Sequence, residues 1–416
     1  MTPPVSVHCI RSLLVPSTLR SCVVVGADQV PRFWATVHDL TEMMALAPNT
    51  RRNALAGIDA FYAHVETIHG ADVLDRLLVD LDVETLSSAL EAFLVRAHNL
   101  AAVEQRVASR RWMAASRFVL GTVRNIAATR GKLQDVEGFR HRLQNLERRV
   151  QQMAWRPPSR QQTLRALPSG VLQDLYAIFD PESERNPFRS EAERFRNYAL
   201  FHVLLHCGLR AGEALLLPVN CIRSQHDPSL LRYRHWMTVR SIFEDAIEID
   251  PRAAQPSLKN ANAVRQIPVT DRVAMLIRDF STKYRRATHD TDALFVSNRG
   301  RPLSKRMLES LMARADAALS RAARDLLIDQ RGPKAAKFTA HDLRHTCAVT
   351  RLNALRKQGV AEDEALSKLR VFFGWSNGSQ MPRYYASAYW ENQLGRIWND
   401  VFDEHIEALK ELESAW

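Results

Sequence analysis

The sequence is poor in the patterns that mark several protein classes. Its 416 residues include five cysteines, and no two of them form a CxxC pair. Such scattered cysteines favour neither a zinc site nor a disulfide framework, so we expect a reducing compartment. No uninterrupted apolar run reaches the ~18 residues that a membrane helix needs. Arg11 and Arg20 interrupt the short apolar patches near the N-terminus, so we expect neither a membrane span nor a signal peptide.

Positive charge is present and is concentrated in one stretch. The formal net charge is +11. Residues 101–166 hold 14 Lys and Arg against 4 Asp and Glu, a balance of +10, whereas residues 361–416 hold 5 against 10, a balance of −5. Clustered cations displace counterions from a phosphate backbone, so this stretch points to a polyanionic partner. The alternative is a solvated, Arg-rich helical surface that binds nothing.

The length and the proline pattern predict more than one domain, because a single core rarely grows to this size. Prolines mark two segments, one near the N-terminus and one between Trp155 and Ser169. Proline resists helix continuation, so the second segment is the best linker. We predict a loose arm at 1–30, a helical domain at 31–155, a linker at 156–168, a second domain at 169–390 and an amphipathic helical tail at 391–416.

Apolar periodicity predicts mostly helix. Residues 33–153 show helical spacing interrupted by turn signals, which indicates a bundle of four or five helices. In the second domain, residues 231–242 and 264–269 are rich in β-formers and read as strands. Helical patterns lie at residues 172–179, 193–206, 211–217, 273–280, 305–319, 341–357 and 364–372. The predicted fold class is mainly α with a small antiparallel β-sheet: a helical domain followed by a mixed α/β domain.

The first chemically suggestive segment is Gly208-Leu209-Arg210-Ala211-Gly212-Glu213-Ala214-Leu215. It places an arginine where one helix ends and another begins, with a glycine suited to the helix end. Arg210 can bind an anion there. The alternative is a surface arginine paired with Glu213.

The second segment is His341-Asp342-Leu343-Arg344-His345-Thr346. A spacing of three puts His341 and Arg344 on one helix face, where both can reach one anion. A guanidinium presents paired donors to phosphate oxygens, and an imidazole can donate or accept a proton. The alternative is a polar helix start with Arg344 in solvent.

The third segment runs from Phe373-Gly374-Trp375 to Arg383-Tyr384-Tyr385-Ala386. A glycine-bounded loop leads here into an aromatic stretch with two adjacent tyrosines. Taken alone, such tyrosines are more often packing residues than nucleophiles.

In this order, the three segments resemble the tyrosine recombinases, the phage-integrase-like enzymes, over roughly residues 165–390. The resemblance implies a helical core-binding domain and a catalytic domain that cuts and rejoins DNA. Arg210 and Glu213 match the family's first arginine and its acidic companion. Lys259 matches the hairpin lysine through its spacing before the second strand, and the alternative is an exposed turn lysine. His341 and Arg344 match the family's H-x-x-R pair.

The third segment does not decide which of two adjacent tyrosines is the nucleophile. Trp375 stands where the family usually has histidine; an indole can donate one hydrogen bond but cannot shuttle a proton, so it would position the phosphate or pack. The commonest spacing selects Tyr384, whereas a longer form of the turn, counted from Met381, selects Tyr385. We favour Tyr385 over Tyr384, with Tyr389 as a more distant alternative.

The resemblance also implies a mechanism. A phenol with a pKa near ~10 is a poor nucleophile at neutral pH and needs cationic neighbours. Arg210 and Arg344 would neutralise the phosphate oxygens, Lys259 would protonate the departing 5′ oxygen, and His341 would assist proton transfer. The product would be a 3′-phosphotyrosyl link, formed without metal or cofactor.

The implied partner is double-stranded DNA, bound by a self-assembled tetramer whose acidic tail docks on a neighbour. We expect a cytoplasmic, nucleoid-associated enzyme of a mobile element. Three alternatives stay open: a DNA-relaxing topoisomerase with the same chemistry, a DNA-binding protein without catalysis, and a basic scaffold without DNA.

Overall fold

The chain forms two compact units, residues 1–161 and 162–416. The computed structural model describes residues 7–9, 22–100, 102–129, 136–153, 165–229, 231–242, 250, 252, 256, 258, 263–286, 291–333 and 335–385. Each unit has a hydrophobic core of its own. Of the predicted limits, those at 155/156 and 390/391 lie outside the described residues and those at 30/31 and 168/169 lie within them; all four stay predictions.

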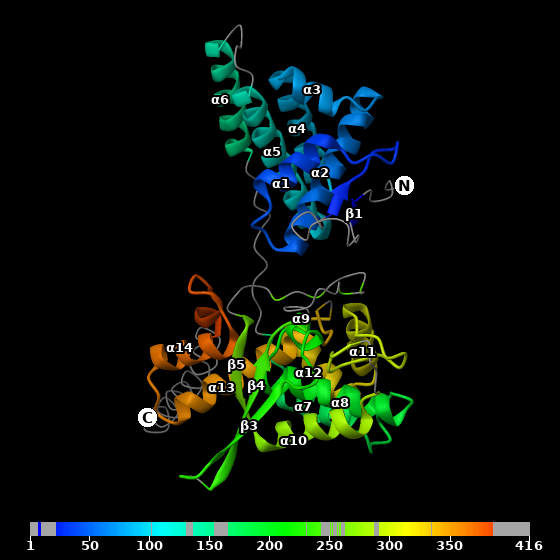
Figure 1. Ribbon diagram of the computed structural model, residues 1–416, viewed down its shortest axis with the longest axis vertical. Coiled ribbons are helices and arrows are strands. Elements are labelled where there is room, and N and C mark those ends of the chain that lie inside the picture. The colour runs from blue at the N-terminus through cyan, green and yellow to red at the C-terminus, as the bar shows by residue number, and fades with distance from the viewer. Residues whose placement is uncertain are drawn as a thin grey trace, which may run out of the picture. The chain divides into compact units, whose positions relative to one another are not determined.

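The first unit is a helical bundle (Figure 1). Its helices within the described residues are α1 (Phe33–Glu42), α2 (Pro48–His69), α3 (Leu74–Asp80), α4 (Val83–His98), α5 (Ala102–Thr129) and α6 (Val136–Gln152). Helix α5 packs against α1, α2, α3 and α4, and α6 packs on α4. Trp112 of α5 is buried and its indole N–H donates to the Leu90 carbonyl at 3.2 Å, so apolar burial centred on α5 holds the bundle together.

Part of the segment predicted as a loose arm forms two paired strands. Strand β1 (Val7–Cys9) pairs antiparallel with β2 (Cys22–Val24). Val24 is fully buried and belongs to the bundle core. The prolines dominated the sequence interpretation, whereas the β-branched valines, which favour strands, determine the structure of this short segment.

The second unit is mixed α/β. Its helices within the described residues are α7 (Ser169–Phe179), α8 (Glu191–His206), α9 (Ala211–Leu215), α10 (Asp271–Asp279), the π-helical turn η3 (Phe280–Tyr284), α11 (Lys305–Ala317), α12 (Arg321–Arg331), α13 (Ala340–Lys357) and α14 (Glu362–Phe373). Three antiparallel strands form one sheet in the order β3 (Ile222–Asp227), β4 (Arg232–Val239) and β5 (Arg265–Val269). The predicted class, mainly α with a small antiparallel sheet, is confirmed.

Two helices of this unit position the candidate residues. Helix α13 packs against both α8 and α14. Apolar residues of α13, α14 and the segment after α14 form a separate buried cluster that includes Cys347, Phe373, Trp375 and Tyr385. Figure 1 shows α13 and α14 beside strand β5. The second and third sequence motifs therefore share one packed region although they lie about 30 residues apart.

Among the helices of the described residues, none combines the length and the apolar character that crossing a bilayer requires.

Candidate active site

Arg210 stands at the junction between α8 and α9, and Gly208 makes this junction possible. Gly208 has a φ of 60°, a left-handed conformation that glycine adopts without a steric cost. A Cβ at this position would lie 2.4 Å from Phe373 Cε1 and 3.0 Å from Cys347 Sγ. The close approach brings the α8–α9 turn directly against α13 and the end of α14.

We expect Gly208→Ala to destabilise the second unit by about 2–4 kcal/mol, because it adds a clash to the backbone strain. Gly359→Ala is the control in the same unit: Gly359 has a φ of 78°, but nothing lies within 4 Å of its added Cβ. The control should therefore cost only about 1 kcal/mol, the strain alone. Urea unfolding measures both, and equal losses would show that the contact with Phe373 is unimportant.

Glu213 is the centre of the arginine cluster. It is fully buried and forms ion pairs with three guanidinium groups: Arg210, Arg265 at 3.1 Å and Arg344 at 3.5 Å. Burial alone would raise the pKa of the Glu213 carboxyl, but the guanidinium groups of Arg265, Arg344 and Arg210 outweigh it and lower the pKa. One carboxylate facing three guanidinium groups leaves a surplus of positive charge, as an anion-binding site requires.

We expect Glu213→Gln to destabilise the protein by about 3–5 kcal/mol, because it leaves buried arginines without their counter-charge. The folded-state pKa of Glu213 lies below its unfolded value. The stability from its ionised form is therefore fully present above the unfolded pKa and is lost as pH falls through the folded pKa. Thermal unfolding from neutral pH into acid should show a flatter profile for the variant than for the wild type. Parallel profiles would contradict this role.

Arg344 ties three segments together. Its guanidinium donates to the Gly208 carbonyl at 2.6 Å and to the Phe373 carbonyl at 2.8 Å, and it lies 4.9 Å from the centre of the Phe373 ring. Burial, followed by the nearby Arg210, lowers its pKa to about 9, so it stays charged at neutral pH. The side chain is only 3% exposed, whereas that of Arg210 is 20% exposed. Of these two cations, Arg210 is the one open to an incoming anion.

His341 lies on α13, three residues before Arg344 and one helical turn before His345. Its imidazole is mostly neutral near pH 7. Burial, followed by Arg165 and Arg344, lowers its pKa to about 4. A neutral imidazole can either accept or donate a proton. It is therefore available for proton transfer beside the cationic cluster.

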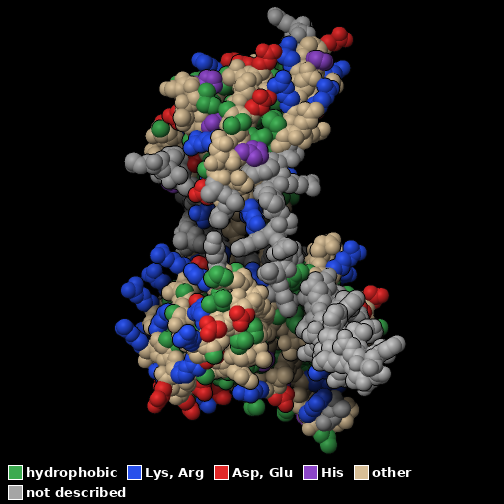
Figure 2. Space-filling model, turned by 180° about the vertical axis from the view of Figure 1, so that it is seen from behind, with side chains coloured by type: hydrophobic (Ala, Val, Ile, Leu, Met, Phe, Trp, Pro, Cys, Tyr) green, Lys and Arg blue, Asp and Glu red, His purple; other side chains and the backbone are tan. Residues whose placement is uncertain are grey.

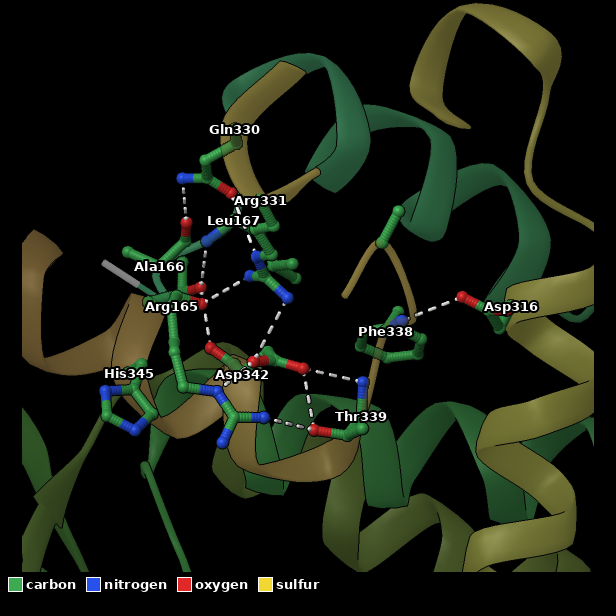
Figure 3. Close-up of polar contacts among 12 residues, drawn as sticks. Arg165, Ala166, Leu167, Asp316, Gln330, Arg331, Phe338, Thr339, Asp342 and His345 are labelled. Carbon is green, nitrogen blue, oxygen red and sulfur yellow. Dashed lines mark hydrogen bonds and ion pairs between the residues drawn. The ribbon is translucent and has the colours of Figure 1, made fainter. Parts of the chain in front are cut away.

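The start of α13 is fixed by a buried carboxylate (Figure 3). Asp342 is fully buried and accepts from Arg165 Nε at 2.9 Å and from the Thr339 backbone N–H at 2.8 Å. Arg331 lies 3.3 Å from the same carboxylate. The Leu167 backbone N–H donates to Thr346 Oγ1 at 2.9 Å. The chain that enters the second unit is thus attached to the helix that carries His341.

Tyr385 lies in a closed aromatic pocket. It is 1% exposed, and its Oη lies 2.8 Å from His345 Nδ1. Trp375 stacks on it with ring centroids 5.5 Å apart, and Phe373 stacks on the other side of Trp375 at 4.9 Å. Gly374, with a φ of 59°, ends α14 and makes the turn that brings Trp375 there. The adjacent Tyr384 is half-buried.

The structure brings most of the predicted site residues around α13. Arg210 and Arg344 meet at Glu213, and Trp375 packs on Tyr385. Tyr385 is close enough to Arg344 for that guanidinium to lower its pKa, although burial raises the pKa by more. Lys259 and Tyr389 lie outside the described residues.

Three further residues belong to this region and were missed by the sequence interpretation: Arg165, Arg265 and His345. Arg265 is the first residue of strand β5, which the sequence interpretation used only to locate Lys259. Its positive charge was the one feature that could have indicated a role in anion binding. Arg165 fell in the predicted linker, where nothing local indicated a partner 177 residues away. His345 directly follows Arg344 but was counted only as part of the motif. No group of His, Cys, Asp and Glu side chains in the described part of the chain has the arrangement of a metal site.

Comparison with known proteins gives one match to a family. The model of the phage integrase family matches residues 172–391. No match was found among the curated proteins.

Solved structures similar to the chain include three recombination proteins. XerH site-specific recombinase bound to difH substrate is 14% identical, with 87% of this chain and 88% of that chain covered and a TM-score of 0.45. The Tn1549 transposon integrase in complex with circular intermediate DNA is 16% identical, with 80% and 98% covered and a TM-score of 0.38. XerA recombinase is 17% identical, with 84% and 92% covered and a TM-score of 0.33.

Proposed function

Because the chain belongs to the phage integrase family, whose model matches more than half of its length, we propose specific roles for its site residues. The chain is a site-specific tyrosine recombinase, an enzyme that cleaves and rejoins DNA strands. Tyr385 is the proposed nucleophile, and the proposed partners in catalysis are Arg210, Lys259, His341, Arg344 and Trp375. The cluster of three guanidinium groups on one buried carboxylate carries this proposal, because it provides surplus positive charge next to a tyrosine.

In the proposed reaction, Tyr385 attacks the scissile phosphate and forms a 3′-phosphotyrosyl link. Arg210, the more exposed of the two arginines, contacts the phosphate oxygens directly. Arg344 is buried, and its positive charge stabilises the developing negative charge in a site of low dielectric. His341, neutral at pH 7, accepts the proton that the Tyr385 phenol loses, and Lys259 protonates the departing 5′ oxygen. Trp375 supports the ring of Tyr385 and cannot itself carry a proton.

The proposed attack requires Tyr385 to leave its pocket. A hydroxyl on a side chain that is 1% exposed cannot contact a phosphorus atom that approaches from solvent. The segment after α14 must therefore rearrange when DNA binds, which moves the phenol from His345 towards Arg210.

The proposed DNA partner fits the distribution of charge. Residues 101–166 carry a balance of +10, and phosphate contacts from such a stretch provide affinity without sequence choice. Figure 2 shows further Lys and Arg side chains along one edge of the second unit.

We further propose that the protein assembles as a tetramer on DNA, with residues 391–416 of each protomer docked on a neighbouring protomer. We also propose that it serves a mobile element and acts on nucleoid DNA in the cytoplasm.

A nicked suicide substrate tests the function. The purified chain, incubated with a duplex that carries its recombination site and a nick beside the cleavage position, should yield a covalent complex stable to detergent. A two-site assay should then give exchanged products rather than relaxed plasmid alone. Relaxation of supercoiled plasmid without strand exchange would contradict the recombinase assignment and favour a topoisomerase.

A further inference from the structure

His345 is a buried titratable residue to which the proposed reaction gives no role. It lies four residues after His341 on α13 and is 4% exposed. Its ring centre is 4.4 Å from that of His341, in an edge-on arrangement, and 5.4 Å from that of Tyr385. Figure 3 shows His345 on the same helix as Asp342, beside Arg165. It therefore lies between the proposed proton-transfer residue and the proposed nucleophile.

The contact between Tyr385 and His345 joins two neutral groups. Burial, followed by the nearby His341 and Arg165, lowers the pKa of His345 to about 3. Burial raises the pKa of Tyr385 above its ordinary value. Both groups are therefore neutral at pH 7, and in the His345 tautomer that carries its proton on Nε2 the phenol donates to Nδ1 at 2.8 Å. In this arrangement His345 does not activate Tyr385 as a base, because the pKa difference strongly disfavours transfer.

The same contact fixes where the hydroxyl points. Trp375 covers one face of the Tyr385 ring, but stacking alone leaves the ring free to slide in its plane. Only the hydrogen bond to His345 specifies the position of Oη among the contacts found for this atom in the described residues. Losing it would leave the phenol oxygen buried without a partner, which is costly.

We propose that His345 is a positioning residue that retains Tyr385 in its sheltered pocket, so that the hydroxyl reaches a phosphate only after this hydrogen bond breaks. The inference rests on the proposed assignment of Tyr385 as the nucleophile. It adds a resting position for that nucleophile and names the side chain that holds it.

The test compares three substitutions at one position. His345→Asn keeps an acceptor, because Asn Oδ1 and His Nδ1 are both bonded to Cγ. His345→Leu removes the acceptor at similar size, and His345→Gln moves it one bond further out. The readout is nitration by tetranitromethane in the free, full-length protein, with peptide mapping of Tyr385 relative to Tyr384. The adjacent tyrosine serves as an internal reference for general loosening of the fold.

We expect the Tyr385-to-Tyr384 nitration ratio to rise about 5- to 10-fold in the Leu and Gln variants, the factor that one net hydrogen bond supplies. The Asn variant should return it to near the wild-type ratio. An unchanged ratio in the Leu and Gln variants, or a rise that Asn does not reverse, would overturn the proposal. The nitration assay needs no DNA, so mapping a DNA adduct to another tyrosine would reject the assigned nucleophile separately from this result.

Discussion

Replacing Tyr385 with phenylalanine will abolish the covalent protein–DNA adduct, by more than about 1,000-fold, because it removes the nucleophile itself. The change deletes only Oη and keeps the ring that stacks on Trp375. The fold should therefore lose only about 1–3 kcal/mol, because the change leaves the buried His345 Nδ1 without its partner. The measurement is adduct yield on a nicked suicide substrate, together with DNA binding by the same variant.

Tyr384→Phe is the matched control for this prediction. Tyr384 is adjacent in sequence and half-buried, and its ring lies 5.2 Å from that of Tyr385. The control variant should retain at least a large part of the adduct yield. Loss of the adduct in the control, with retention in Tyr385→Phe, would transfer the nucleophile to the neighbouring residue.

Replacing Arg344 with alanine will also abolish covalent attachment while much of the DNA binding is retained. The site would lose a positive charge that stabilises the transition state, whereas phosphate contacts elsewhere on the protein would remain. The structure adds a second consequence. Arg344 donates to the carbonyls of Gly208 and Phe373 and pairs with Glu213, so the variant should unfold about 3–5 kcal/mol more easily.

Arg344→Lys separates the two effects. Lysine restores a positive charge next to Glu213 but cannot reproduce the planar pair of donors that reaches both carbonyls. We expect this variant to recover part of the cleavage, because the positive charge is restored, and only a small part of the stability, because the carbonyls of Gly208 and Phe373 lose their donors. Normal covalent yield from Arg344→Ala, measured below its unfolding temperature, would remove Arg344 from the site.

The motif-bearing residues were predictable because their chemistry is local in sequence. Arg210 and Glu213 lie within one helical turn, and His341 and Arg344 are three residues apart on one helix, so helical spacing alone places each pair on one face. The long helices and the strands at 231–242 and 264–269 were predictable for a similar reason, since their apolar and β-branched patterns are strong.

Contacts between distant segments were not predictable. Arg265 lies 52 residues from Glu213, and Arg165 lies 177 residues from Asp342; no local pattern indicates either pair. Strand β3 was missed because its sequence, Ile-Arg-Ser-Gln-His-Asp, is polar and lies at the sheet edge. Helix α12 was missed because its three large apolar residues, Leu326, Leu327 and Ile328, are consecutive and do not by themselves form a helical repeat.

The burial of Tyr385 was the least predictable feature. The sequence indicated two adjacent tyrosines and the spacing from the turn. Their exposure, however, depends on the stack of Phe373, Trp375 and Tyr385, which lies where α14 packs on α13. The register argument chose between two residues whose surroundings differ: Tyr385 is buried against His345, whereas Tyr384 is half-buried.

Peptide mapping of the trapped DNA adduct tests the central claim most directly. The wild-type chain is reacted with a nicked suicide substrate, the complex is digested with protease and nuclease, and the modified peptide is sequenced by mass spectrometry. We predict a nucleotide attached to Tyr385. Attachment to Tyr384 or to any other residue, or the absence of an adduct under conditions in which the chain binds the substrate, would contradict the account.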